Sequence, residues 1–171
     1  ALFLLPIDPV GLGAKLWGQE SSVPAKPQWE APQEVVIVAV GDLRLDGHVG
    51  RLIGSEGPQA PTQQIRHWLK GDIVFGNLEC SLTQRGTPLD KRFNFRAPPN
   101  HISALTTIPF TIVSLANNHV MDFGVVGLKD TLITLKDAGI HFVGAGENAL
   151  AAYQPVFLEK NGLRVGFLAF T

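Results

Sequence analysis

The chain has a single cysteine, Cys80, so it cannot form an intramolecular disulfide or a multi-cysteine zinc site. Charged residues are scarce, at 17% against a usual figure of about 25%. Lysine and arginine number 14 and acidic residues 15, so the chain lacks the basic field of a nucleic-acid-binding protein. No apolar run approaches the roughly 18 to 20 residues that span a bilayer. With 171 residues, there is room for one domain with an ordinary core.

Residues 1–33 read as a tail and linker rather than as part of the domain. Residues 1–6 (ALFLLP) are apolar, and we interpret them either as the remnant of a signal or anchor segment or as a disordered or docking tail. Residues 18–33 are polar and rich in proline, which is typical of a linker. The folded part, residues 34–171, is therefore expected to begin near Glu34.

Within residues 34–171, short β-branched runs alternate with helical stretches, which predicts an α/β fold with a mainly parallel sheet flanked by helices. The predicted strands are 35–40, 72–75, 110–115 and 140–143, followed by a hairpin of 156–159 and 163–170. The predicted helices are 61–69, 100–107 and 125–138, with a glycine-rich loop at 41–57. The first strand is almost continuously apolar, which fits a sheet buried on both faces.

Three of the predicted strands end in polar side chains that suit metal binding. Asp42 follows the first, Asn77 and Glu79 follow the second, and Asn118-His119 follows the third. The carboxyl ends of parallel strands meet at one edge of a sheet, where ligands bind. Carboxylates, amide oxygens and neutral imidazoles bind Mn, Fe, Zn or Mg. These five residues therefore predict a metal site, in which the metal would polarise a phosphoryl oxygen or activate water.

Each of these residues also has an ordinary structural explanation. Asp42 follows a glycine, which suits a turn or a helix cap. Asn117-Asn118 suits a left-handed turn, and His119 would then cap the next helix or pack in the core. Glu79 is harder to explain in this way, because a carboxylate directly after a buried strand needs a partner or solvent. Taken together, the combination favours a site.

In order and spacing, these motifs resemble the bacterial capsule-synthesis protein family. The matching elements are Gly41-Asp42, Asn77-Leu-Glu79, Ser114-Leu-Ala-Asn-Asn-His119 with Asp122-Phe-Gly124, and Gly144-Ala-Gly146. That family includes the poly-gamma-glutamate biosynthesis proteins and belongs to the calcineurin-like metallophosphatase superfamily. The resemblance covers residues 35–171 and implies a layered α/β fold with a metal site at the strand ends.

The resemblance also implies a role for each matching residue. Asp42 corresponds to the first aspartate ligand, and Asn77 with Glu79 to the second motif. Asn118 would bridge toward the metal, and His119 would bind metal or stabilise the leaving oxygen. The expected cofactor is a divalent metal such as Mn, Fe or Zn.

Three further residues complete the predicted site. Asp122 would hold the second nitrogen of His119, which makes His119, Asn118 and Asp122 the candidate catalytic residues. Arg44 and Arg96 are candidates for binding an anionic substrate group. For both arginines the alternative is an ordinary solvated side chain.

The chain departs from the superfamily pattern in its metal shell. Leu43-Arg44 follows Asp42 where Asp-x-His is typical, Asn77 stands where a bridging aspartate is usual, and the sequence has no Gly-His-x-His element. We therefore expect the N-terminal portion of a larger domain, with an incomplete site in this chain. Two functions stay open: metal-assisted phosphoester hydrolysis or transfer, and non-catalytic handling of polymer or assembly on the same fold.

The resemblance implies partners and a location as well. The expected substrate is an anionic polymer or a phosphoester, and nucleic acid is not expected. Other subunits of an envelope polymer-synthesis system are the expected protein partners. The location that follows is the cell envelope, either extracytoplasmic or anchored to the membrane through a segment before Ala1.

Overall fold

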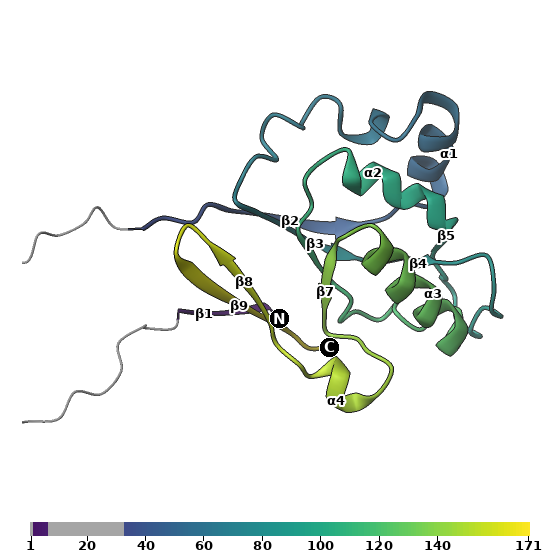
Figure 1. Ribbon diagram of the computed structural model, residues 1–171. Coiled ribbons are helices and arrows are strands. Elements are labelled where there is room, and N and C mark those ends of the chain that lie inside the picture. The colour runs from purple at the N-terminus through teal and green to yellow at the C-terminus, as the bar shows by residue number, and fades with distance from the viewer. Residues whose placement is uncertain (1, 7–32) are drawn as a thin grey trace, which may run out of the picture.

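The computed structural model describes residues 2–6 and 33–171 (Figure 1). A four-stranded parallel sheet in the order β2-β3-β6-β7 forms the centre, beside a three-stranded antiparallel sheet, β1-β9-β8, and a short β4-β5 pair. The strands are β1 (Leu2–Pro6), β2 (Ile37–Leu43), β3 (Ile73–Leu78), β4 (Ser81–Leu82), β5 (Arg96–Ala97), β6 (Ile112–Ser114), β7 (His141–Val143), β8 (Val156–Lys160) and β9 (Leu163–Ala169). The helices are α1 (Gly47–Glu56), α2 (Ser103–Thr106), α3 (Gly124–Asp137) and α4 (Ala149–Ala152), with 3₁₀ turns η1 (Ala60–Thr62) and η2 (Pro99–Ile102).

The prediction of a mainly parallel sheet flanked by helices is confirmed. All three pairings in the central sheet are parallel, and β3 and β6 are its buried inner strands. The expectation that the first strand is buried on both faces is wrong. In the described part of the chain β2 is an outer strand of this sheet, and several of its residues are exposed.

The two faces of the central sheet pack against different layers. Side chains alternate along a strand, so Ile73 and Phe75 of β3 face the antiparallel sheet, where the Phe75 ring stacks with Phe167 of β9 at 6.1 Å between centroids. Val74 belongs instead to the larger cluster that includes Leu132 of α3. Figure 1 shows α1, α2 and α3 on one side of the sheet and the β8–β9 hairpin on the other. The chain therefore forms three layers: helices, parallel sheet and antiparallel sheet.

The first helix lies where a loop was predicted. Residues 41–57 contain the end of β2 and all of α1, whereas the predicted helix at 61–69 is only η1 followed by turns. The three glycines of α1 lower its helix propensity, but Gly50 has a packing reason. A Cβ on Gly50 would lie 2.9 Å from the Leu45 carbonyl oxygen and 3.3 Å from the His101 ring. Glycine at position 50 therefore reflects close packing against its neighbours rather than a loop.

The later elements lie close to their predicted positions. The predicted helix at 125–138 is α3, and the one at 100–107 is divided between η2 and α2. The predicted hairpin is formed by β8 and β9, and Asn161 and Gly162 have φ values of 51° and 78° at its turn. Two successive positive φ values are what a two-residue hairpin turn of this hand requires.

The N-terminal strand pairs with the C-terminal one. β1 lies antiparallel to β9, with Leu4 opposite Phe167, so part of the apolar segment at residues 1–6 has a place in the second sheet. The predicted linker at residues 18–33 lies outside the described residues except for Gln33. In the described ranges, no helix is long and apolar enough to cross a membrane.

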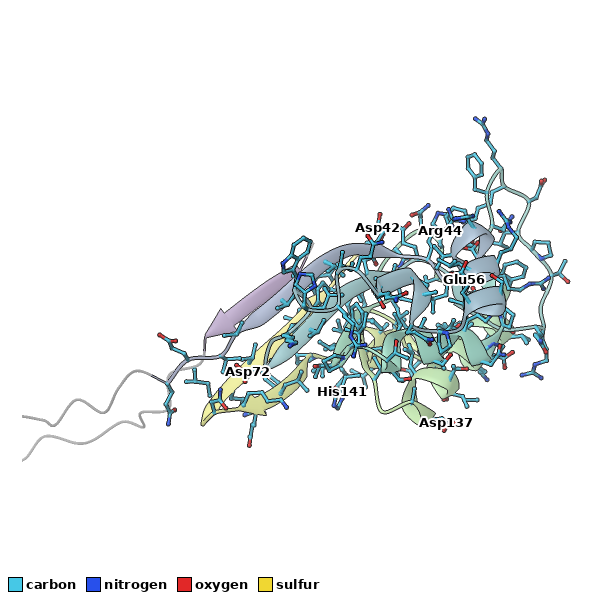
Figure 2. The ribbon with its side chains drawn as sticks, turned by 90° about the horizontal axis from the view of Figure 1, so that it is seen from above. Asp42, Arg44, Glu56, Asp72, Asp137 and His141 are labelled. Atoms are coloured by element: carbon cyan, nitrogen blue, oxygen red, sulfur yellow. The ribbon has the colours of Figure 1, made fainter. Side chains whose placement is uncertain are left out.

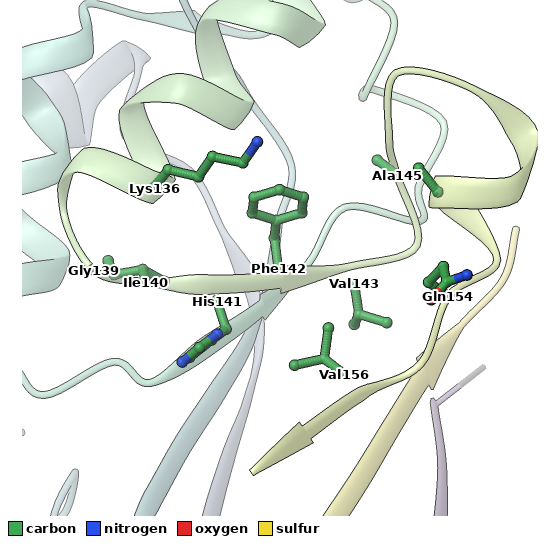
Figure 3. Close-up of a pocket in the computed structure, with 10 residues that line it drawn as sticks. Lys136, Gly139, Ile140, His141, Phe142, Val143, Ala145, Gln154 and Val156 are labelled. Carbon is green, nitrogen blue, oxygen red and sulfur yellow. The ribbon is translucent and has the colours of Figure 1, made fainter.

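A cavity of about 530 Å³ runs along the outer edge of β7, between the end of α3 and the start of β8. Figure 3 shows Lys136 of α3 reaching over the Phe142 ring, with its ammonium nitrogen 6.0 Å from the ring centroid. None of the residues that line this cavity belongs to the predicted site. The polar strand ends therefore lie outside this cavity.

Candidate functional site

Asp42, Asn77 and Glu79 form one hydrogen-bonded cluster. Asp42 of β2 lies in register with Asn77 of β3, just after a register shift that begins at Ala39. Such an irregularity re-aims the side chains that follow it. The Asn77 Nδ2 group donates to Asp42 Oδ1 at 2.8 Å and to Glu79 Oε1 at 3.4 Å. Asp42 is thus neither a helix cap nor an isolated turn residue, because one amide group joins it to a second carboxylate.

Asn117 links this cluster to the third strand end. Its Nδ2 donates to Asn77 Oδ1 at 3.0 Å and to the Leu78 carbonyl oxygen at 2.9 Å, and its Oδ1 accepts the His119 backbone N–H at 2.9 Å. These three bonds fix the Asn117 amide, which in turn fixes the Asn77 amide with its nitrogen toward the two carboxylates. Asn118, the residue predicted to bridge toward the metal, is exposed. Its backbone carbonyl oxygen accepts a 2.7 Å hydrogen bond from Lys91 Nζ.

Sequence reasoning therefore missed the connecting role of Asn117. The Asn-Asn pair offered two adjacent amides of identical chemistry, and only burial distinguishes them: Asn117 is 6% exposed. Asn117 lies beyond the end of β6 at Ser114 and is buried, and its amide satisfies buried backbone and side-chain groups. Because both residues are asparagine, the residue types do not predict which of the two side chains turns inward.

His119 and Asp122 form a second cluster, buried beside the first. His119 Nδ1 lies 2.9 Å from Asp122 Oδ2, which is the hydrogen bond expected from the sequence. Asp122 is fully buried, and the same oxygen accepts the Phe95 backbone N–H at 2.6 Å. Its other oxygen forms an ion pair with Lys91. The buried carboxylate is thus compensated by a cation, a ring nitrogen and a backbone donor, as a charge in a protein interior must be.

Phe95 packs against one face of the His119 imidazole. The Phe95 ring is stacked on the His119 ring at 4.0 Å between centroids. The Cζ atom of Arg44 lies over the Phe95 ring, 3.4 Å from its centroid. Because one face cannot hold both groups at these distances, Phe95 lies between them. Arg44 also pairs with Asp46, with Nε 2.9 Å from Oδ1, and this hydrogen bond raises the pKa of the guanidinium above its ordinary value.

The two predicted substrate-binding arginines occupy different places. Arg44 follows β2 and reaches the imidazole cluster through Phe95, and Figure 2 shows it close to Asp42 and far from Asp72. Arg96 is exposed on β5, and its guanidinium lies 4.5 Å from the Phe123 ring centroid. The structure brings Arg44 to the site and leaves Arg96 at its outer side.

The donor set decides which metals the site suits. Asp42 and Glu79 are the two carboxylates that share the Asn77 amide, and in the described residues no three His, Cys, Asp or Glu side chains are placed to hold one ion together. A structural or catalytic zinc site takes three or four such ligands. Mg²⁺-type sites need only one or two carboxylates, with water and substrate phosphate as the other ligands. Two carboxylates match the number that a Mg²⁺-type site uses and are fewer than the ligands that zinc usually takes.

Cys80 follows Glu79 but faces the core. It is 3% exposed, its Sγ accepts a 3.4 Å bond from the Leu45 backbone N–H, and burial raises the thiol pKa to about 12. The thiolate is the reactive form, so the folded chain should react with a maleimide or a thiol-exchange reagent far more slowly at pH 7.5 than the urea-unfolded chain. Following the reaction by mass spectrometry checks this. Equal rates in the two states would contradict the buried position of Cys80.

The comparison with known proteins bears on these clusters directly. The family described as bacterial capsule synthesis protein PGA_cap matches residues 36–171, a range that contains every residue of both clusters. The chain belongs to this family. The family assignment and the layered fold agree with the resemblance seen in the motifs.

Individual relatives extend the comparison. The chain is 31% identical over 173 residues to the capsule biosynthesis protein CapA of Bacillus anthracis, covering 98% of this chain and 42% of that protein. It is 28% identical to the PGA biosynthesis protein CapA of Bacillus subtilis, covering 98% and 45%. A probable polyglutamine synthesis accessory protein of Mycobacterium tuberculosis is 34% identical over 134 residues, covering 75% and 35%. The chain thus spans less than half the length of these relatives.

Proposed function

We propose that this chain contributes a metal-dependent phosphoester site to capsule or poly-gamma-glutamate synthesis, acting in hydrolysis or transfer. The observation that carries the proposal is the pair of carboxylates, Asp42 and Glu79, held by one amide at the carboxyl ends of neighbouring parallel strands. Ligands of open parallel sheets bind at that edge. The names of the relatives, which concern capsule and polyglutamate synthesis, support the process and a location in the cell envelope.

Asp42 and Glu79 would hold the cation, and of the metals expected from the sequence Mn²⁺ fits this donor set best. Oxygen ligands suit Mn²⁺, whereas Zn²⁺ favours nitrogen and sulfur. When bound, the cation would polarise a phosphoryl oxygen. Asn77 keeps the two carboxylates together, and Asn117 holds Asn77 in place.

His119 would act on the leaving oxygen. Its Nδ1 is engaged by Asp122, so Nε2 is the ring nitrogen left to accept or donate a proton or to bond a phosphoryl oxygen. Asp122 fixes the ring orientation through that bond, and Phe95 fixes it through stacking. Arg44, on the far face of Phe95, places a positive charge near the site that would attract an anionic substrate.

A second function is favoured by one observation. Two carboxylates are a small donor set, and in the described residues no third acidic, histidine or cysteine side chain joins them. A non-catalytic subunit that handles polymer or assembles other proteins would tolerate such a set. The two functions differ in whether the chain binds a metal at all.

Titration of the metal-free chain with Mn²⁺ by calorimetry tests the proposal. We expect one site that Asp42→Asn and Glu79→Gln each weaken by at least about tenfold, since even a hydrogen-bond partner of a ligand is worth about 10- to 100-fold. Asp137→Asn is the matched control, because this exposed residue ends α3 far from Asp42 (Figure 2). Absence of Mn²⁺ binding, or equal losses in all three variants, would rule out the metal site and leave the non-catalytic function.

A further inference from the structure

A second cavity adjoins the carboxylate cluster. It encloses about 380 Å³ between β2, α1, α2 and the segment around η1. Asp42 is one of its lining residues, and the same residue is hydrogen-bonded to Asn77 in the candidate site. Its volume lies in the range of about 300–1,000 Å³ that small-molecule sites occupy. The cavity and the proposed metal site therefore share Asp42.

The walls of this cavity are almost entirely apolar. Apart from Asp42, only Arg44 and Thr62 bring polar side chains to it. The remaining lining residues are Val40, Leu43, Leu45, Val49, Pro61, Ile65, Leu69, Ala104, Leu105 and Phe110. Ile65 is 41% exposed although it lines the cavity, so it forms part of the cavity lip. The cavity thus combines one carboxylate and one guanidinium with a lining that is otherwise mainly apolar.

This arrangement selects for one kind of ligand. An alkyl or aromatic group would exchange water for apolar contacts along the body of the cavity, which is favourable. A sugar or another polyol would lose its hydrogen bonds to water there, and three polar side chains at most would replace them. Few charged or polar groups fix the position of a ligand in such a site, and apolar walls supply its contacts.

We propose that the cavity is a subsite for the apolar portion of an amphipathic phosphoester. The phosphate group lies at Asp42 and Glu79 together with the cation, and the alkyl or aromatic alcohol portion lies between β2 and the segment around η1. This subsite rests on the proposed function, because the phosphate position depends on the metal site. It narrows the substrate class to phosphoesters with an apolar alcohol portion.

Two phosphate monoesters that differ only in the alcohol test the subsite. Octyl phosphate below its micelle concentration and glycerol 3-phosphate are titrated into the chain with saturating Mn²⁺. We expect octyl phosphate to bind at least about tenfold more tightly, because its chain replaces water in an apolar cavity. Equal affinities would overturn the subsite while leaving the metal site intact. No binding of either compound would instead remove the proposed function and the subsite with it.

Two variants test whether the tighter binding of octyl phosphate comes from this cavity. Val49→Phe fills part of the cavity, and Ile65→Asn makes its lip polar at a partly exposed position that tolerates substitution. Each should reduce the preference for octyl phosphate by at least about fivefold and leave glycerol 3-phosphate unaffected. Ile133→Asn is the control, because Ile133 of α3 is 55% exposed and does not line this cavity. A preference that survives in both cavity variants would place the alkyl chain elsewhere and overturn the proposal.

Discussion

The His119→Ala variant is expected to hydrolyse diphenyl phosphate, whose leaving oxygen needs a proton, about 10²- to 10⁴-fold more slowly than the unchanged chain in the presence of Mn²⁺. The reason is the geometry of the imidazole cluster. Asp122 engages Nδ1 and Phe95 stacks on the ring, so in the proposed reaction Nε2 would be the atom that gives a proton to the leaving oxygen. Alanine would remove that proposed proton donor and leave the carboxylates of Asp42 and Glu79 in place. Release of phenol, followed by its absorbance, measures the loss.

Two further variants test whether the loss of activity comes from the His119–Asp122 pair. His141→Ala removes an exposed histidine that lines the β7 cavity, and its activity should stay within about twofold of the unchanged chain. Asp122→Asn keeps the side-chain shape but permits the other ring tautomer of His119, so activity should fall by about 10-fold or more. The nitrogen NMR shifts of His119 should change with it. If His119→Ala and His141→Ala are equally active, His119 has no catalytic role.

The elements with strong apolar patterns were predictable. Each inner strand of the central sheet is a short apolar run, and α3 has its buried residues at helical spacing, so local pattern and tertiary burial agree. α1 was not predictable, because its three glycines are typical of a loop, and the packing of Gly50 against Leu45 and His101 is a tertiary contact that the sequence does not show. The outer position of β2 also depends on strand order, which the apolar content of that strand does not encode.

The site was predictable to the level of its strand ends and no further. The polar residues at the carboxyl ends of β2 and β3 and after β6 were identified because parallel strands bring their ends to one edge. Phe95 and Lys91 lie outside the helices and strands. In the structure they contact His119 and Asp122 from an irregular segment about 25 residues earlier in the chain. Contacts of that kind depend on the path of a loop without periodicity, so no local pattern predicts them.

The Phe167→Ala variant should lower the free energy of unfolding by about 3–5 kcal/mol. Phe167 is fully buried in β9, stacks on Phe75 of the parallel sheet and belongs to the cluster that joins the two sheets. Alanine would leave a cavity between layers that cannot close, because both walls are sheets fixed by backbone hydrogen bonds. Urea denaturation followed by circular dichroism measures the loss as a lower midpoint at unchanged slope.

The matched control lies on the neighbouring strand. Phe157 of β8 is 39% exposed, so Phe157→Ala removes the same ring from a position where water already reaches it, and the loss should be about 1 kcal/mol. A difference of 2 kcal/mol or more between the two variants would therefore measure how strongly the antiparallel sheet is attached to the parallel one. Equal losses would mean that the second sheet does not pack against the parallel sheet through Phe167. Because β3 carries Phe75 on one face and Asn77 near its end, firm attachment of that layer also fixes the strand that positions the carboxylate cluster.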